Sequence, residues 1–210
     1  RFQPCSCNVY LPRNSEVFID GTIVEINMAG IYGSGKIDCT KGSISIDDWH
    51  GDIDIDCTSA NSRISQCEGE VKIDSSSGNV DILFSQGNIF CDTSAGSVKI
   101  QDSSGSLSAD TGSGNVHVAN FRGPVHIDAG RGSAELQSVF SHNVYVDSGS
   151  GSITAIFPGT VSGRWQLYTG SGSIDLQIPE NISSRFDFQG RRLDVDELNL
   201  DFLVQGDNRI

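Results

Sequence analysis

Residues 92–109 read DTSAGSVKIQDSSGSLSA, and residues 110–127 read DTGSGNVHVANFRGPVHI. The two segments share one order of features: an aspartate, a glycine-bearing corner, an apolar pair, a second glycine and a second apolar pair. Apolar residues spaced by two predict a β-strand with one buried face. Each 18-residue unit is therefore expected to hold two short strands separated by corners.

The unit recurs from about residue 20 to residue 176, and self-similarity at a fixed spacing indicates a repeat architecture. The repeated aspartates are Asp20, Asp38, Asp56, Asp74, Asp92, Asp110 and Asp128, with Asp147 following after 19 residues. Apolar columns repeat in the same way, as in Ile46, Ile64 and Ile82. Because every unit repeats the same inward set, stacked coils ~4.8 Å apart fit better than hairpins. We predict an all-β, single-chain β-solenoid (β-helix or roll) of about nine coils.

The regular repeat ends before both termini. We expect residues 1–19 to form an N-terminal cap, residues 20–188 the repeat domain and residues 189–210 a C-terminal cap or tail, because exposed solenoid edges need covering. A third, intermittently apolar column lies between the strand pairs: Ile31, Trp49, Cys67, Ser85, Ser103, Phe121 and Val139. This column leaves a flattened two-sided roll and a three-sided prism both open.

The composition excludes several classes of protein. With 14 basic and 27 acidic residues, the net charge is −13, which argues against a nucleic-acid binder. Twenty Asp against seven Glu argue against a helical protein, because Asp favours caps and turns. No run of ~18 apolar residues is present, so no membrane-spanning segment is predicted.

The repeated aspartates predict a ladder of stacked carboxylates whose repulsion must be compensated. We interpret Asp38, Asp56, Asp74, Asp92, Asp110 and Asp128 as a structural ladder, each accepting backbone N–H groups of its own corner. The alternative is calcium held between coils, since carboxylate oxygens are hard ligands. The expectation is no cofactor and no metal site, with calcium as the alternative.

Two segments are candidates for binding. An insertion around Phe157, Pro158 and Trp165 lengthens one coil to 21 residues, and we expect it to project as a binding loop. The segment Asp47–Asp56 is acidic and contains Trp49 and His50. By the alternation rule Asp52 and Asp54 point outward, which favours solvated acid over a catalytic carboxylate cluster with a general base.

Cys39 and Cys57 occupy one column on adjacent coils. They could form a disulfide in an oxidising compartment, although parallel in-register strands are not especially suited to one.

Three stretches carry a family resemblance: Asp110-Thr-Gly-Ser-Gly-Asn-Val-His-Val, Asp147-Ser-Gly-Ser-Gly-Ser-Ile and Tyr168-Thr-Gly-Ser-Gly-Ser-Ile-Asp-Leu-Gln-Ile-Pro. They resemble a family of β-strand-repeat domains named as adhesins, of unknown function, common in bacterial envelopes and present in some eukaryotes. The similarity spans roughly residues 35–180. It implies a β-solenoid in a secreted or cell-envelope protein, with a eukaryotic organelle as the alternative, and it supplies no catalytic residues.

The function these features favour is a non-catalytic interaction or scaffold domain that binds a protein or cell-surface partner. A rigid solenoid presents an already ordered surface, which lowers the entropic cost of binding. Two alternatives stay open: a surface-carbohydrate-processing enzyme using the Asp47–Asp56 segment, and a calcium-stabilised adhesin.

Overall fold

The computed structural model describes residues 11–12, 14–157, 162–177, 183–189 and 192–195. Three strands of 16 residues, β1 (Val17–Tyr32), β2 (Gly35–His50) and β3 (Ile53–Glu68), each wrap most of one coil. Shorter strands follow: β4 (Val71–Ser77), β5 (Val80–Leu83), β6 (Gln86–Thr93), β7 (Val98–Thr111), β8 (Val116–Arg122), β9 (Val125–Asp128), β10 (Ala134–Gln137), β11 (Asn143–Ser148), β12 (Ile153–Ile156), β13 (Ser162–Thr169), β14 (Ser173–Gln177), β15 (Ser183–Gln189) and β16 (Arg192–Val195). The described strands therefore run from Val17 to Val195.

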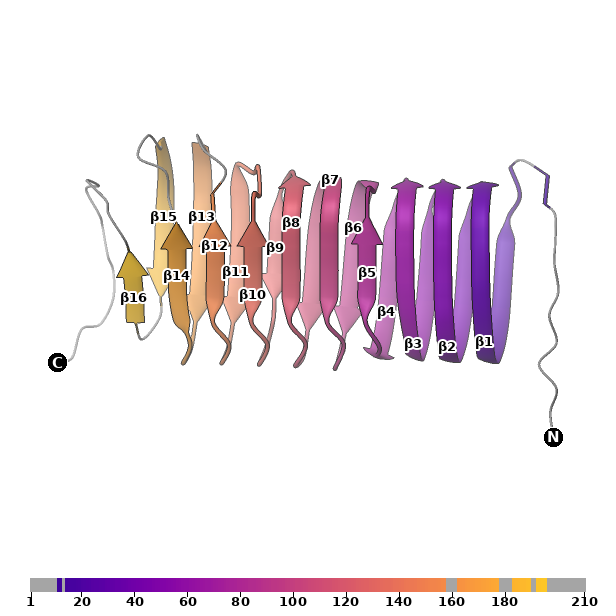
Figure 1. The fold of residues 1–210 in the computed structure, drawn as a ribbon, viewed down its shortest axis with the longest axis horizontal. Helices are drawn as coiled ribbons and strands as arrows, with labels where there is room; N and C mark the ends of the chain where they lie inside the picture. Colours follow the sequence, from indigo (N-terminus) through magenta and orange to yellow (C-terminus); the bar gives the residue numbers. More distant parts are fainter. Residues whose placement is uncertain (1–10, 13, 158–161, 178–182, 190–191, 196–210) are drawn as a thin grey trace.

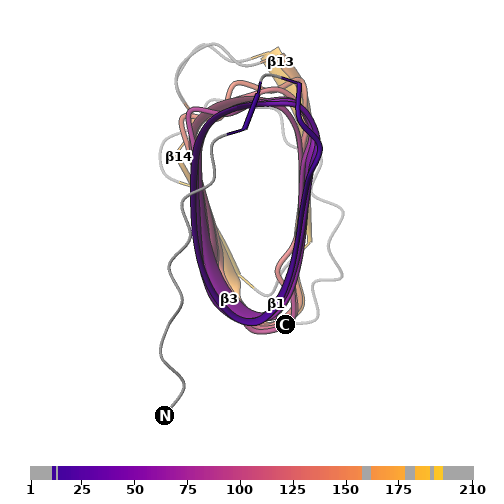
Figure 2. The same cartoon turned by 90° about the vertical axis from the view of Figure 1, so that its right-hand side faces the viewer.

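The strands form an all-β solenoid of about nine coils, as predicted (Figure 1). Every strand pairing is parallel and joins residues one coil apart, as in Ile37 with Ile55 and Val98 with Val116. Seen along its long axis, the chain makes a flattened ring with two long sides and two curved ends (Figure 2). The coil is thus a two-sided roll.

The two sides are named here by their outer faces. The ladder sheet, which carries the repeated aspartates, contains the first halves of β1–β3, then β4, β6, the end of β7, β9, β11, β13 and β15. The opposite sheet contains the second halves of β1–β3, then β5, the start of β7, β8, β10, β12, β14 and β16. The apolar columns of both sheets meet inside the ring and form one continuous core.

The third column of the sequence is part of the wall of this core, at the bend between the sheets. Trp49, Cys67 and Phe121 are fully buried there. Buried serines continue the column: the Ser103 hydroxyl accepts the Ser85 N–H at 3.0 Å and donates to the Gln101 carbonyl at 2.8 Å. Because these polar groups are paired inside the bend, the column can alternate between apolar and hydroxyl residues without a third sheet.

The bend itself depends on residues in the left-handed region. Asp102 and Asn120 stand there in successive coils, each with φ of 51°. Asn and Asp tolerate this conformation better than most residues. The Asn120 amide also donates to Asp102 Oδ1 at 2.5 Å, so the bend residues of two coils are linked.

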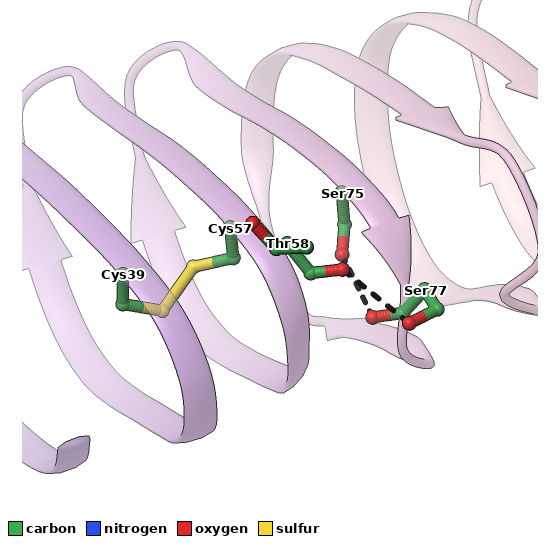
Figure 3. The surroundings of a disulfide bond; sticks show 5 residues. All are labelled: Cys39, Cys57, Thr58, Ser75 and Ser77. Carbon is green, nitrogen blue, oxygen red and sulfur yellow. Dashed lines mark hydrogen bonds between the residues drawn. A yellow bond between two sulfur atoms is a disulfide. The ribbon is translucent and has the colours of Figure 1, made fainter. Parts of the chain in front are cut away.

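A disulfide joins Cys39 of β2 to Cys57 of β3, with Cα atoms 4.7 Å apart (Figure 3). The same inward column continues with hydroxyl residues: Ser75 donates to the Ser77 carbonyl at 3.1 Å, and Thr93 to the Gly96 carbonyl at 2.9 Å. The two cysteines thus replace a corner hydrogen bond by a covalent link between coils.

We expect the double substitution Cys39→Ser and Cys57→Ser to lower the free energy of unfolding by about 3 kcal/mol, because the bond closes an 18-residue loop. Serine is the matched replacement, since Ser75 already fills this column with a corner hydrogen bond. Urea unfolding of the variant, beside the wild type with and without a thiol reductant, measures the effect. The reduced wild type should unfold at the same urea concentration as the variant. If both have the midpoint of the oxidised wild type, the disulfide does not stabilise the fold.

No helix among the described residues is long and apolar enough to cross a membrane. Residues 1–10 and 196–210, which hold most of the two predicted caps, lie outside the described residues.

Candidate binding face

The aspartate ladder is the row Asp20, Asp38, Asp56, Asp74, Asp92, Asp110, Asp128 and Asp147 on the outer face of the ladder sheet. Each member is paired in register with the next, from Asp20 with Asp38 to Asp128 with Asp147. The side chains are exposed or half-buried. The solenoid therefore lines up eight carboxylates at the inter-coil spacing of ~4.8 Å.

The corner hydrogen bond expected at every aspartate is present in the described chain only at Asp128, which accepts the Gly130 N–H at 3.1 Å. The expectation was wrong for the other members. After Asp92 and Asp110 the adjacent inward threonine holds the corner instead: Thr93 donates to the Gly96 carbonyl at 2.9 Å and Thr111 to the Gly114 carbonyl at 2.8 Å. After Asp38 and Asp56 the adjacent residues are the cysteines of the disulfide.

Stacking leaves some of these carboxyls in an unfavourable environment. Partial burial, together with the charges of Asp128 and Asp92, raises the pKa of Asp110 above its ordinary value. Burial and Asp128 likewise raise the pKa of Asp147, opposed by a hydrogen bond with Tyr145. Ionisation of Asp110 and Asp147 therefore disfavours the folded state.

We expect Asp110→Asn to raise the melting temperature at pH 7 by up to about 3 °C, because it removes the like-charge cross-strand contacts with Asp92 and Asp128. A raised folded-state pKa means that the folded chain holds the proton more tightly, so stability is lost as pH rises through that pKa. The gain in melting temperature should therefore vanish near pH 3, where position 110 is neutral in both the wild type and the variant. Thermal melts at both pH values test this against Asp175→Asn, which removes an exposed charge on the opposite sheet. A lower melting temperature of Asp110→Asn at pH 7 would contradict the prediction.

An aromatic row runs beside the ladder, two residues earlier on each strand. The register aligns Phe90 with Ser108, Ser108 with His126, and His126 with Tyr145. The rings of His126 and Tyr145 are stacked, with centroids 4.7 Å apart and planes 12° apart. Tyr168, next after Asp147 in the ladder column, continues the contact at 5.6 Å from Tyr145. Phe90 is 40% exposed.

A hollow of about 270 Å³ opens in this row, and we call it the aromatic groove. It is lined by Phe90, Ser106, Leu107, Ser108, Pro124, Val125, His126, Asn143 and Tyr145. Its floor reaches the buried side chains Leu107 and Val125. The groove combines apolar walls, an aromatic pair and several hydroxyl or amide groups, which are the usual features of a ligand site.

The outer face of the opposite sheet is internally paired. Arg63 contacts Asp81 at 2.7 Å, and the His117 ring lies 3.1 Å from Glu135. A column of Ser and Asn side chains forms a hydrogen-bonded ladder at the start of this sheet, in which Asn61 accepts the Asn79 N–H at 2.9 Å. The same contact recurs to Ser97, Asn115, Ser133, Ser152 and Ser173. The ladder face also carries ion pairs, Lys36 with Asp38 at 3.8 Å and Lys72 with Asp54 at 3.6 Å, but it holds in addition the aromatic row and its groove.

The aromatic residues proposed for binding from the sequence are part of the core. Phe157 and Trp165 are 6% and 1% exposed and contact each other with centroids 4.0 Å apart. Trp165 is in register with Val144 of β11, an inward position, so it belongs to the strand and not to a projecting loop. Trp49 is buried in the bend. These three expectations are corrected; Pro158 lies outside the described residues.

His50 lies between two carboxylates, with Nδ1 3.0 Å from Glu68 and Nε2 3.1 Å from Asp48. Its ring stacks on Tyr32 at 4.4 Å. A histidine with both nitrogens engaged can act as a general base only if one contact breaks.

The acidic residues near His50 also have structural partners. Asp52 accepts the Glu70 N–H at 2.8 Å, and Asp54 lies 3.6 Å from Lys72. Asp47 accepts the Ser65 hydroxyl at 2.5 Å. The segment is thus a network of inter-coil contacts.

The free cysteines of the described chain, Cys67 and Cys91, are buried. Burial raises the pKa of Cys67 to about 11 and that of Cys91 to about 12. Both therefore remain unreactive thiols in the folded state. Among the described residues, no group of three or more His, Cys, Asp or Glu side chains is placed to hold a metal ion.

The in-register coils, the two flattened sheets and the outer side-chain ladders define a β-solenoid repeat domain. The chain belongs to the Toastrack DUF4097 family, whose model matches residues 68–196. A comparison with curated proteins found no match, and neither did a comparison with solved structures. The family is a domain of unknown function, so membership does not assign the adhesin role that the sequence resemblance implies.

Proposed function

We propose that this chain is a non-catalytic scaffold domain that binds a partner protein on the outer face of its ladder sheet. The observation that carries the proposal is the aromatic row with its groove on the outer face of the ladder sheet. On the ladder sheet, a row of carboxylates, exposed aromatic rings and a groove lie together on a rigid surface.

The physical support for this role is that the face is already ordered. Inter-coil hydrogen bonds and a continuous core fix the backbone beneath the aromatic row. Binding such a surface does not require the chain to fold first, so little entropy is lost in the scaffold. Tyr and Phe side chains also supply large contact areas with few rotatable bonds. An adhesin would be one form of this role, with the partner on a cell surface.

The test is site-specific photocrosslinking in the native source. A photoreactive residue replaces Lys72, an exposed position beside Phe90 on the ladder face and outside the groove lining. In a second chain it replaces Lys99, an exposed position on the opposite sheet. The expected result is one discrete partner crosslinked at position 72 and absent at position 99. That partner, once purified, should bind wild-type chain in a defined ratio. Equal labelling at both positions, or none at 72, counts against the proposal.

A further inference from the structure

The aromatic groove has a gap of defined size. Ser108 stands in the column between Phe90 and His126, so two rings lie two coils apart with one small side chain between them. Two coil spacings amount to about 10 Å. The gap is therefore wide enough for a flat group with the Phe90 ring on one side and the His126 ring on the other. The Tyr145 ring, stacked behind His126, extends the wall in the C-terminal direction.

The charge beside this gap is negative, and His126 offsets it only in part. Asp92, Asp110 and Asp128 flank the three coils of the gap, two residues further along each strand. In the described part of the chain no ion pair neutralises them; the ladder sheet's nearby Lys72 contacts Asp54 instead. Burial first, and then repulsion by Asp128 and Asp92, raise the pKa of Asp110. A cation bound here would relieve that repulsion.

Aromatic faces beside carboxylates are suited to a particular chemistry. A ring attracts a cation above its face, and a carboxylate nearby adds a charge-assisted hydrogen bond. The guanidinium of arginine is planar, stacks on aromatic rings and carries donors at its edge. A neutral sugar could also stack on the rings, but it would not relieve the repulsion among the aspartates.

We infer that the aromatic groove binds an arginine side chain from an extended basic segment of the partner protein. The guanidinium enters between Phe90 and His126 and donates to the aspartates beside them. This inference rests on the proposed function, since it names the kind of partner that the ladder face takes.

The experiment uses the full chain and a fluorescein-labelled peptide that alternates arginine and serine, titrated by fluorescence anisotropy. An alternating lysine peptide, a glutamate peptide and a β-linked glucosamine oligomer are the comparison probes. We expect the arginine peptide to bind most tightly, and its affinity to fall as salt rises from about 50 to about 500 mM. We expect Phe90→Ser and His126→Ser each to weaken binding about tenfold, a common loss for a contact at the centre of an interface.

Matched variants separate the groove from general attraction to an acidic chain. Asp110→Asn with Asp128→Asn should weaken arginine-peptide binding about tenfold or more. Asp81→Asn with Asp175→Asn makes the same change in net charge on the opposite sheet and should leave binding within about twofold. Phe84→Ser removes an exposed ring from a bend outside the groove and should also have no effect. Melting curves confirm that each variant is folded.

Three outcomes overturn the inference: no peptide binding, equal binding by groove and control variants, or binding of the sugar oligomer alone. The crosslinking at position 72, outside the groove lining, gives an independent result. A protein partner captured there that binds Phe90→Ser and wild type alike would leave the scaffold role standing and remove the arginine site. Arginine-peptide binding at the groove without a crosslinked partner would support the arginine site and count against the scaffold role.

Discussion

Replacing Gly105 with alanine should lower the free energy of unfolding by more than about 4 kcal/mol, an exceptional loss for one methyl group. Gly105 lies in β7 with φ of +128°, a conformation that side-chain-bearing residues rarely adopt. A Cβ atom built there would lie 1.9 Å from the Gly87 carbonyl oxygen of the preceding coil. Backbone atoms on both sides of this contact are held by the pairing of β6 with β7, so neither coil can move away alone.

The same contact recurs through the glycine column, with Gly69, Gly87 and Gly123 each directed at a glycine carbonyl of the preceding coil. A substitution should therefore separate two coils and not merely loosen a loop. Far-UV circular dichroism during urea unfolding measures the loss, and hydrogen exchange should show reduced protection in β6 and β7. Ser104→Ala, one residue away, is the control and should cost less than about 1 kcal/mol. If Gly105→Ala unfolds within about 1 kcal/mol of wild type, the close stacking of these coils is wrong.

The sequence predicted the register well, because in a parallel solenoid the columns of an alignment become columns in space. The spacing of Asp92, Asp110 and Asp128 alone specified which residues would be paired. It also aligned Phe90, Ser108 and His126, so the aromatic row could have been found by comparing outward columns. What alignment could not give was the depth of the groove, which depends on how the small Ser108 leaves space between its neighbours.

The insertion shows why a break in the repeat is harder to interpret. Counting from Asp147 made Trp165 part of an irregular loop. The alternation of Trp165, Leu167 and Thr169, however, matches the inward set Val144, Val146 and Ser148. The extra residues therefore precede β13, and the tryptophan belongs to the core. Hydroxyl residues caused a second difference, since buried Thr111 fulfils the corner role that the sequence analysis gave to the exposed aspartate.

Trp165→Ala should lower the free energy of unfolding by about 3 to 5 kcal/mol, the usual cost of truncating a buried aromatic side chain. Trp165 is 1% exposed and packs against Phe157 where the longest coil closes. Trp165→Phe is the matched control. The indole N–H has no hydrogen-bond partner among the described residues, so phenylalanine loses volume but no hydrogen bond. We expect it to cost less than half as much as alanine.

Urea unfolding of the two Trp165 variants, with the wild type beside them, also discriminates between the two interpretations of the insertion. A core tryptophan predicts a large loss of stability for alanine, a small one for phenylalanine, and unchanged crosslinking at position 72 in the folded phenylalanine variant. A binding-loop tryptophan predicts the opposite: stability close to wild type in both variants, with partner binding lost. Since β13 pairs with both β11 and β15, the loss of the Trp165 side chain should first cause local unfolding of these neighbouring strands. Hydrogen exchange in β11 and β13 should therefore rise in Trp165→Ala, while β2 and β3, linked by the disulfide at the other end, retain their protection.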